Sequence, residues 1–267
     1  MSTIVETIQA IVRQELARVR VADLGVVEAV GPHRAQGDGD NYGCDVRLKN
    51  SGLLLKRVPI ATQHIGSAAI PNAGDLVLLT YDKGDVNQPI VIGRLYSDAD
   101  RPPLNDSREI VTRLPLAEAD DRTIRTVVRN VPASSPPREA LLEMPPRITL
   151  RVTDGTVRAT AGNTEMKLDQ QGAGGGTVTV FAGRSTVTIN QDGDVTVDAA
   201  GGLALKAAGA VSIQGRSVSI KALTSATVEA GTTLTAKGGA TATLQAGATA
   251  TVQGAVVSVK GITSFGP

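Results

Sequence analysis

Residues 195–261 read VTVDAAGG LALKAAGA VSIQGRS VSIKALTS ATVEAGTT LTAKGGAT ATLQAGAT ATVQGAV VSVKG when they are written in blocks of seven or eight. Each block opens with an apolar, small, apolar triplet and continues with a polar residue. Another triplet begins at Val187, so ten triplets follow one another in steps of 7 or 8 residues. Gly and Ala after the polar residue suit a tight turn. Each block therefore predicts one short strand followed by one corner.

The repeat also predicts how the strands are covered. In a strand the two outer residues of a triplet face the same side, and so short a strand buries that side only by stacking. A β-helix made from one chain needs a longer coil than eight residues, whereas three interlaced chains can each supply one octad per face. The sequence predicts an intertwined homotrimeric triple-stranded β-helix, with a disordered tail or a single-chain β-roll as alternatives. The predicted trimer core comprises Val187, Ile189, Val195, Val197, Leu203, Leu205, Val211, Ile213, Val218, Ile220, Val257 and Val259.

These octads, of the form V-x-V-x-x-x-x-x, resemble the triple-stranded β-helix in the central spike of contractile phage tails and type VI secretion (VgrG) proteins. The resemblance covers more than a quarter of the chain. It implies a rigid trimeric rod that lies at the centre of a baseplate.

A second motif lies in the front half, where residues 24–96 contain five short strand-like runs separated by turn signals. Five strands in a segment of this length predict a small Greek-key barrel of the OB type. The stretch 71–93 resembles the OB domain of the same spike family, in which P-x-x-G-D-x-V-L precedes G-D-x-x-x-P-x-V-I-G. The matching residues are Pro71, Gly74, Asp75, Val77, Leu78, Gly84, Asp85, Pro89, Val91, Ile92 and Gly93.

The sequence therefore predicts an all-β fold with one helix at the N-terminus. Thr3 and Glu6 can form a capping box, and Ile4, Ile8 and Ile11 fall on one helical face. This face could pack on its own domain, join copies of the chain, or dock on a hub. The predicted parts are a helix at 1–20, a barrel at 21–100, an extended connector rich in Pro and charge at 101–146, a β-helix shaft at 147–260 with regular octads from about 187, and a blunt tip at 261–267.

Composition argues against several function classes. The net charge is +1, so the basic surface of a nucleic-acid-binding protein is missing. The histidines, His33 and His64, both fall in the predicted barrel without a nucleophile at a suggestive spacing. Residues 37–43 are rich in oxygen ligands but lack the final Glu of an EF-hand loop. We expect no enzyme, no cofactor and no metal site.

Three further candidates for chemistry have ordinary structural explanations. Asp120 and Asp121 lie in the predicted connector, away from apolar surroundings that would tune a general acid. Cys44 is the sole cysteine, which excludes a disulfide within the chain. Tyr42, Tyr81 and Tyr96 could stack bases or sugars. An OB-fold oligonucleotide- or glycan-binding module, and a trimeric β-helical receptor-binding fibre or glycan-cleaving tailspike, are therefore the alternatives to a spike.

The family resemblance implies further expectations about partners. About 20 residues precede the barrel, so the hub of the machine is expected to be a separate protein, contacted through Ile4, Ile8 and Ile11. The inner tube and other baseplate proteins are further expected partners. Ile262 and Phe265 at the end of the shaft are expected to seat a PAAR-repeat tip protein, unless this terminus is frayed. The N-terminus has no signal-peptide pattern, so synthesis in the cytoplasm is expected. Assembly into a phage tail-like particle that contacts the target envelope would follow.

Overall fold

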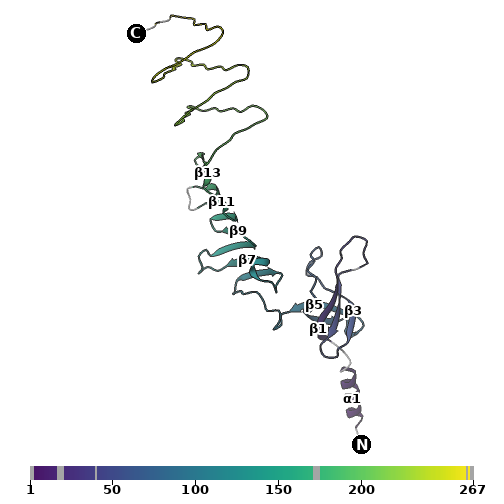
Figure 1. Ribbon diagram of the computed structural model, residues 1–267. Coiled ribbons are helices and arrows are strands. Elements are labelled where there is room, and N and C mark those ends of the chain that lie inside the picture. Colours follow the sequence, from purple (N-terminus) through teal and green to yellow (C-terminus); the bar gives the residue numbers. More distant parts are fainter. Residues whose placement is uncertain (1–2, 17–20, 40, 171–174, 263, 265–267) are drawn as a thin grey trace. The chain divides into compact units, whose positions relative to one another are not determined.

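The computed structural model describes residues 3–16, 21–39, 41–170, 175–262 and 264. The chain divides into two units, 1–204 and 205–267. Among the described residues, the first unit contains one α-helix, two short 3-10 helices (Asp82–Gly84 and Asp120–Arg122) and two antiparallel sheets, and the second contains no strand. The protein is thus mostly β, as predicted. Figure 1 shows the order of these elements along the chain.

Helix α1 spans Ile4–Leu16, and the predicted capping box begins it. The backbone N–H of Thr3 donates to Glu6 Oε2 at 2.9 Å, and the Glu6 N–H donates to Thr3 Oγ1 at 3.4 Å. These bonds satisfy N–H groups that have no partner within the helix. The described side chains of α1 are all exposed.

The first sheet is the predicted OB-like barrel. Its strands are β1 (Ala22–Gly31), β2 (Gly43–Leu48), β3 (Leu54–Pro59), β4 (Leu76–Tyr81) and β5 (Pro89–Leu95). Their spatial order is β3-β2-β1-β4-β5, with every neighbouring pair antiparallel. An isolated bridge between Ile60 and Val91 brings the chain after β3 onto β5. The N–H of Ala61 donates to the Val91 carbonyl at 2.8 Å, which closes the barrel.

Aliphatic side chains fill the barrel, since the sequence contains no Trp and very few other aromatics. The core consists of Val27, Cys44, Val46, Leu48, Val58, Val77, Leu79 and Val91. Gly25 is required inside β1, because a Cβ there would lie 2.3 Å from Val46 Cγ1. Pro89 is the first residue of β5, and Gly84 has a positive φ of 76°. Gly93 does not have a positive φ, so relief of backbone strain does not explain that glycine.

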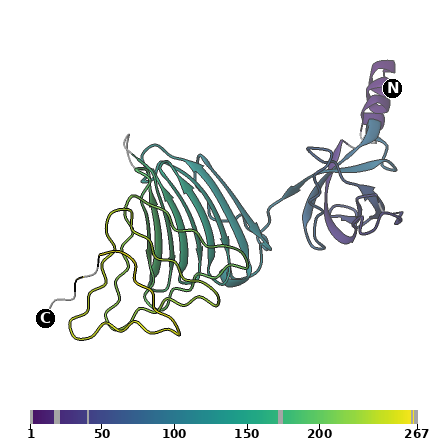
Figure 2. The ribbon, with the colours of Figure 1, turned by 90° about the horizontal axis from the view of Figure 1, so that it is seen from above.

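The second sheet is a nine-stranded antiparallel meander in which each strand pairs with the next one in sequence. Figure 2 shows these strands side by side. They are β6 (Glu109–Leu114), β7 (Ile124–Asn130), β8 (Arg138–Met144), β9 (Ile148–Thr153), β10 (Thr156–Ala161), β11 (Thr164–Asp169), β12 (Thr177–Ala182), β13 (Ser185–Asn190) and β14 (Val195–Asp198).

The segment 101–146 is therefore not the extended connector that the sequence predicted, because β6, β7 and β8 lie within it. Its Pro-rich and charged stretches form the loops between these strands, while the strands alternate apolar and charged residues. Val128 in β7, for example, pairs with Ile110 on one side and with Ala140 on the other. The sheet begins about 40 residues earlier than the predicted start of the shaft at 147.

The second unit, 205–267, contains extended segments joined by bends. Bends lie at 208–209, 216, 223–224, 231–232, 239–240, 247–248, 255 and 261, and the described residues of this unit include no strand. The apolar–small–apolar triplets lie between successive bends. The structure thus confirms one corner per octad, whereas the strand predicted for each triplet does not form within the described residues of this unit. Figures 1 and 2 show this part of the chain as wide, open turns.

Candidate functional site

The most distinctive surface of the chain is one face of the nine-stranded sheet, here called the apolar face. Its side chains form rows that cross the strands in register. One row, from β6 to β14, consists of Ile110, Val128, Ala140, Val152, Val157, Leu168, Val178, Ile189 and Val195. The neighbouring row consists of Thr112, Thr126, Leu142, Leu150, Ala159, Met166, Val180, Val187 and Val197.

The two threonines in the second row hydrogen-bond to each other through their hydroxyl groups, so they satisfy one another within the apolar face. No other described element of this chain covers the face fully: Leu150 is 43% exposed, Val197 51% and Ile110 70%. Monomeric soluble proteins rarely expose an apolar surface that continues over so many strands. The face is therefore a candidate contact surface for another protein chain.

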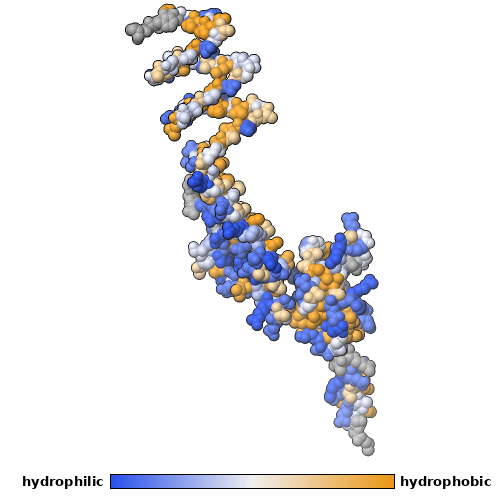
Figure 3. All heavy atoms as spheres, viewed as in Figure 1, coloured by the Kyte–Doolittle hydropathy of each residue, from blue (hydrophilic) through white to orange (hydrophobic). Residues whose placement is uncertain are grey.

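The opposite face is polar and carries ion pairs between adjacent strands. Arg125 of β7 pairs with Glu143 of β8 at 3.0 Å, and Arg158 of β10 pairs with Glu165 of β11 at 3.4 Å. Figure 3 shows hydrophilic side chains gathered over this sheet, with hydrophobic ones beside them. A sheet with one apolar and one charged face normally has one side packed and the other in water.

Glu139 of β8 lies on the charged face, and its side chain is only 5% exposed. Its carboxylate forms ion pairs with Arg129 Nη2 at 2.6 Å and with Arg151 Nε at 2.5 Å, and these arginines lie on the strands on either side of β8. A buried carboxylate is tolerated when it is paired in this way. Val127 of β7, which pairs with Leu141 of β8, is also only 5% exposed.

The predicted trimer-core residues fall into two groups. Val187, Ile189, Val195 and Val197 lie on the apolar face, but within one chain: Val187 pairs with Val197 and Ile189 with Val195. The expectation that neighbouring octads come from different chains is thus wrong for these first two octads. The reason is a tight turn, in which the Asn190 N–H donates to the Asp194 carbonyl at 3.1 Å.

The second group follows β14, where no described residue belongs to a strand. Its members are all exposed within the single chain: Leu203, Leu205, Val211, Ile213, Val218, Ile220, Val257 and Val259. Ile220, for example, is 81% exposed. Extended backbone that lacks a strand partner leaves its N–H and C=O groups without the bonds that a sheet provides. This segment therefore offers both apolar side chains and backbone groups to a partner.

The two predicted docking sites are exposed as well. Ile4, Ile8 and Ile11 of α1 are each more than half exposed. Ile262 is fully exposed. Phe265 lies outside the described residues, so the structure does not test whether it joins Ile262.

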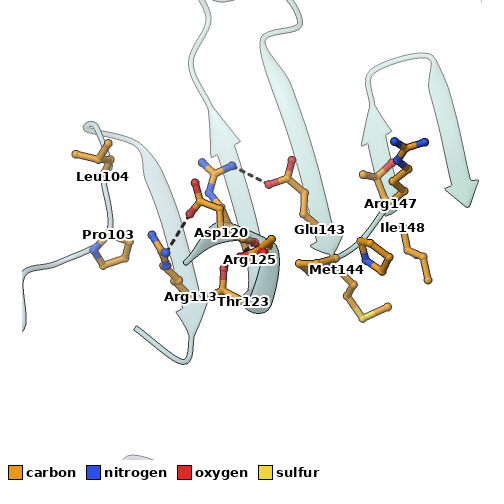
Figure 4. Close-up of a pocket in the computed structure, with 14 residues that line it drawn as sticks. Pro103, Leu104, Arg113, Asp120, Thr123, Arg125, Glu143, Met144, Arg147 and Ile148 are labelled. Carbon is orange, nitrogen blue, oxygen red and sulfur yellow. Dashed lines mark hydrogen bonds and ion pairs between the residues drawn. The ribbon is translucent and has the colours of Figure 1, made fainter. Parts of the chain in front are cut away.

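A pocket of about 600 Å³ lies beside β6–β9 and is drawn in Figure 4. Its charged side chains include two ion pairs, Arg113 with Asp120 at 3.0 Å and Arg125 with Glu143 at 3.0 Å. The other lining residues include Pro103, Leu104, Thr123, Met144, Arg147 and Ile148. Asp120 and Asp121 both line this pocket and are exposed, and Asp120 pairs with Arg113, so neither carboxylate has the apolar surroundings that would tune a general acid.

The remaining candidates for chemistry are dispersed. The side chain of His33 lies 2.5 Å from Asp38 in an exposed loop, and His64 lies in a different exposed loop. The backbone N–H of Ala35 lowers the pKa of Asp38 most, and the backbone N–H of Arg34 and the side chain of His33 lower it further. Burial raises the pKa of the Cys44 thiol to about 11, which makes it a poor nucleophile.

The three tyrosines do not form a common stacking surface. Tyr81 is buried, and its hydroxyl donates to Asp23 at 2.7 Å. The Tyr42 hydroxyl accepts the Ala69 N–H at 2.7 Å, whereas Tyr96 is exposed. Tyr81 is therefore excluded as a platform for bases or sugars.

The described residues contain neither a candidate metal site nor a candidate membrane-spanning helix. No group of three or more His, Cys, Asp or Glu side chains in that part of the chain could hold a metal ion. None of its helices has the length and apolar character needed to cross a membrane.

Comparison with known proteins agrees with the barrel assignment. Residues 51–96 match the family model described as the type VI secretion system/phage-baseplate injector OB domain. The match includes all of the motif at 71–93 and covers β3, β4 and β5. A search of curated proteins found no match to the chain. The family match supports kinship with spike proteins of the VgrG type and a structural role at a baseplate.

Proposed function

We propose that this protein is the homotrimeric central spike of a contractile injection machine, such as a phage tail, a tailocin or an extracellular injection system. The observation that carries the proposal is the uncovered apolar face of β6–β14, followed by octads without strand partners, in a chain that also contains a baseplate-type OB domain. A single chain leaves both surfaces exposed to water, which costs free energy in proportion to the apolar area.

Three copies can cover these surfaces together. Three apolar faces turned toward a common axis form a prism with a dry interior and charged outer sides. In the octad region, straight segments joined by corners can form the sides of a triangle, and segments from different chains then provide one another's strand partners. Along such a shaft no strand edge stays open. Two copies could also cover their apolar faces by packing the two sheets as a sandwich. That arrangement would not explain why the octads have a corner at regular intervals.

The proposed action is mechanical, and we assign the protein no catalytic activity. The shaft carries thrust from the inner tube to the tip when the sheath contracts, and it pierces the target envelope. Backbone hydrogen bonds that run along the axis between chains resist local fraying. Rigidity is therefore the property that this repeat supplies.

The remaining partners follow from the ends of the chain. Ile4, Ile8 and Ile11 of α1 offer an apolar stripe to a separate hub protein, and the barrel is seated next to the tube. Ile262 and Phe265 receive a PAAR-repeat tip protein. We place the assembled protein in a tail-like particle that is built in the cytoplasm and acts at or outside the cell surface.

The test is to tag the chain in its native host and to image purified particles by electron microscopy. Label at the centre of the baseplate, together with loss of functional particles when the chain is deleted, is the expected result. Particles that assemble and kill normally without the chain would contradict the proposal.

A further inference from the structure

The charges of the octad region occupy one position of the repeat. Of six charged residues between 199 and 262, five stand directly after an apolar–small–apolar triplet, and the sixth, Arg216, lies in a bend. In an extended segment this fourth position faces away from the two apolar residues of the triplet. If the apolar residues face the axis of a trimer, the fourth position faces solvent. The five charged residues are Lys206, Lys221, Glu229, Lys237 and Lys260.

The offset between the chains, counted in octads, determines which of these residues become neighbours on one face of the trimer. A chain that winds around the axis places successive octads on successive faces. With an offset of one octad, each octad of one chain is followed on its face by the next octad of another chain, about 4.8 Å further along the axis. The fourth positions on a face then form a column in sequence order. From the first octad after β14, this column reads Lys206, Gln214, Lys221, Glu229, Lys237, Gln245, Gln253 and Lys260.

The order of charges in the column distinguishes an offset of one octad between chains from offsets of zero, two or three octads. With an offset of one octad, Glu229 is placed between Lys221 and Lys237, and no like charges are adjacent. An offset of zero would place each of the five charges beside its own copies. An offset of two would pair Lys206 with Lys221 and Lys221 with Lys237, with no opposite charges adjacent. An offset of three would give one opposite pair, Lys206 with Glu229, and one like pair, Lys237 with Lys260. The offset of one octad is thus the one that the charges favour.

We propose that Lys221, Glu229 and Lys237 form an ion-pair ladder between chains, and that this ladder selects the register in which three copies of the chain interlace. The proposal rests on the trimer proposed above. A repeat whose apolar pattern is nearly the same in every octad specifies its register weakly. Opposite charges on adjacent strands stabilise a pairing, and like charges disfavour it. Gln214 and Gln245 bound the ladder, so the three charges form an isolated unit.

The first experiment reverses the central charge of the ladder. Glu229→Lys creates three adjacent positive charges, and we expect it to lower the melting temperature of the trimer by on the order of 5 °C at low salt. High salt should shrink this loss. The triple variant Lys221→Glu/Glu229→Lys/Lys237→Glu restores alternation and should regain the melting temperature. Lys260→Glu is the matched control, because its column neighbour is Gln253 and the change should have little effect.

The second experiment reads the register directly. In a Cys44→Ser background, Thr227→Cys and Thr235→Cys place cysteines at the middle position of two successive triplets. With an offset of one octad, residue 227 of one chain lies beside residue 235 of another, so oxidation of the double variant should yield covalent trimers on a non-reducing gel. Each single variant should stay uncrosslinked, because identical octads occupy different faces.

The outcomes separate this inference from the proposed function. A full-length protein that is monomeric in solution would overturn both. A trimer in which Glu229→Lys has no effect, or in which Thr227→Cys alone crosslinks, would overturn the ladder and leave the spike. A trimer with the expected loss, its rescue by the triple variant, and crosslinking of the double cysteine variant alone would establish the register.

Discussion

Ile189 lies directly opposite Val195 across β13 and β14, and strand pairing within the described part of the chain ends with these two strands. The apolar face that begins at β6 is continuous up to this pair. Beyond it, the same alternation of apolar and small residues continues without a strand partner. The chain thus changes at this point from a sheet to extended segments that have no strand partner within the described residues.

Assembly of the trimer should be disrupted by a charge introduced on the apolar face of β14 but not by a charge on its opposite face. Val197 belongs to the apolar face, while the adjacent Thr196 pairs with Thr188 on the opposite face. We expect Val197→Asp to dissociate or aggregate the trimer, because three carboxylates would be buried near the axis. Thr196→Asp is the matched control and should keep the mass of the wild type. Size-exclusion chromatography with light scattering measures both, and an intact trimer in Val197→Asp would argue that this face is not buried.

The buried carboxylate of the charged face should contribute more than its exposed counterparts. Glu139→Gln replaces the carboxylate shared by Arg129 and Arg151 with a neutral amide, and we expect it to cost about 1–3 kcal/mol of unfolding free energy. Glu165→Gln removes the more exposed pair with Arg158 and should cost less than about 1 kcal/mol. Chemical denaturation of the two variants compares them. Equal losses would show that burial of Glu139 is unimportant.

Inside the barrel, Gly25 should tolerate no larger side chain. A Cβ at this position would lie 2.3 Å from Val46 Cγ1 and 3.1 Å from the Arg47 carbonyl oxygen. We expect Gly25→Ala to destabilise the barrel by about 1–3 kcal/mol. Gly93→Ala is the control, since a Cβ there would have open space within 4 Å. Denaturation midpoints that change equally in the two variants would contradict this packing.

Asp45 should make the stability of the barrel depend on acid pH. A hydrogen bond from the Lys56 ammonium, followed by one from the Arg57 backbone N–H, lowers the pKa of Asp45 below its usual value. A lowered folded-state pKa stabilises the protein above the unfolded pKa, and this contribution is lost as the pH falls through the folded pKa. The wild type should therefore be more stable than Asp45→Asn near pH 7, and the difference should shrink below about pH 4. A difference in denaturation midpoint that stays constant from pH 7 to pH 3 would contradict this role.

Part of the architecture could be predicted from the sequence because it depends on local patterns. The octads predicted the bends between 208 and 255, and the motif at 71–93 predicted the barrel that the family match supports. Both patterns recur at fixed spacings or combine Gly and Pro at defined positions. Local chemistry determines where such corners and turns form.

Other features depend on pairing over distance and were missed. Residues 101–146 contain many prolines and charged residues, and this composition favoured a connector over the strands β6, β7 and β8 that the segment forms. Their charged residues lie on the charged face, where ion pairs between adjacent strands satisfy them, and this arrangement can be recognised only once the pairing register of the strands is known. The in-chain pairing of Val187 with Val197 was missed for a related reason, since the triplets before and after the turn at 190–194 look alike.

The central claim is that three copies of this chain form one shaft, and the solution mass tests it most directly. Light scattering on the purified full-length protein should give 82.2 kDa, the mass of three chains of 27.4 kDa. A monodisperse species of 27.4 kDa would contradict the account, because the apolar face and the unpaired octads would then be stable in water without a partner chain.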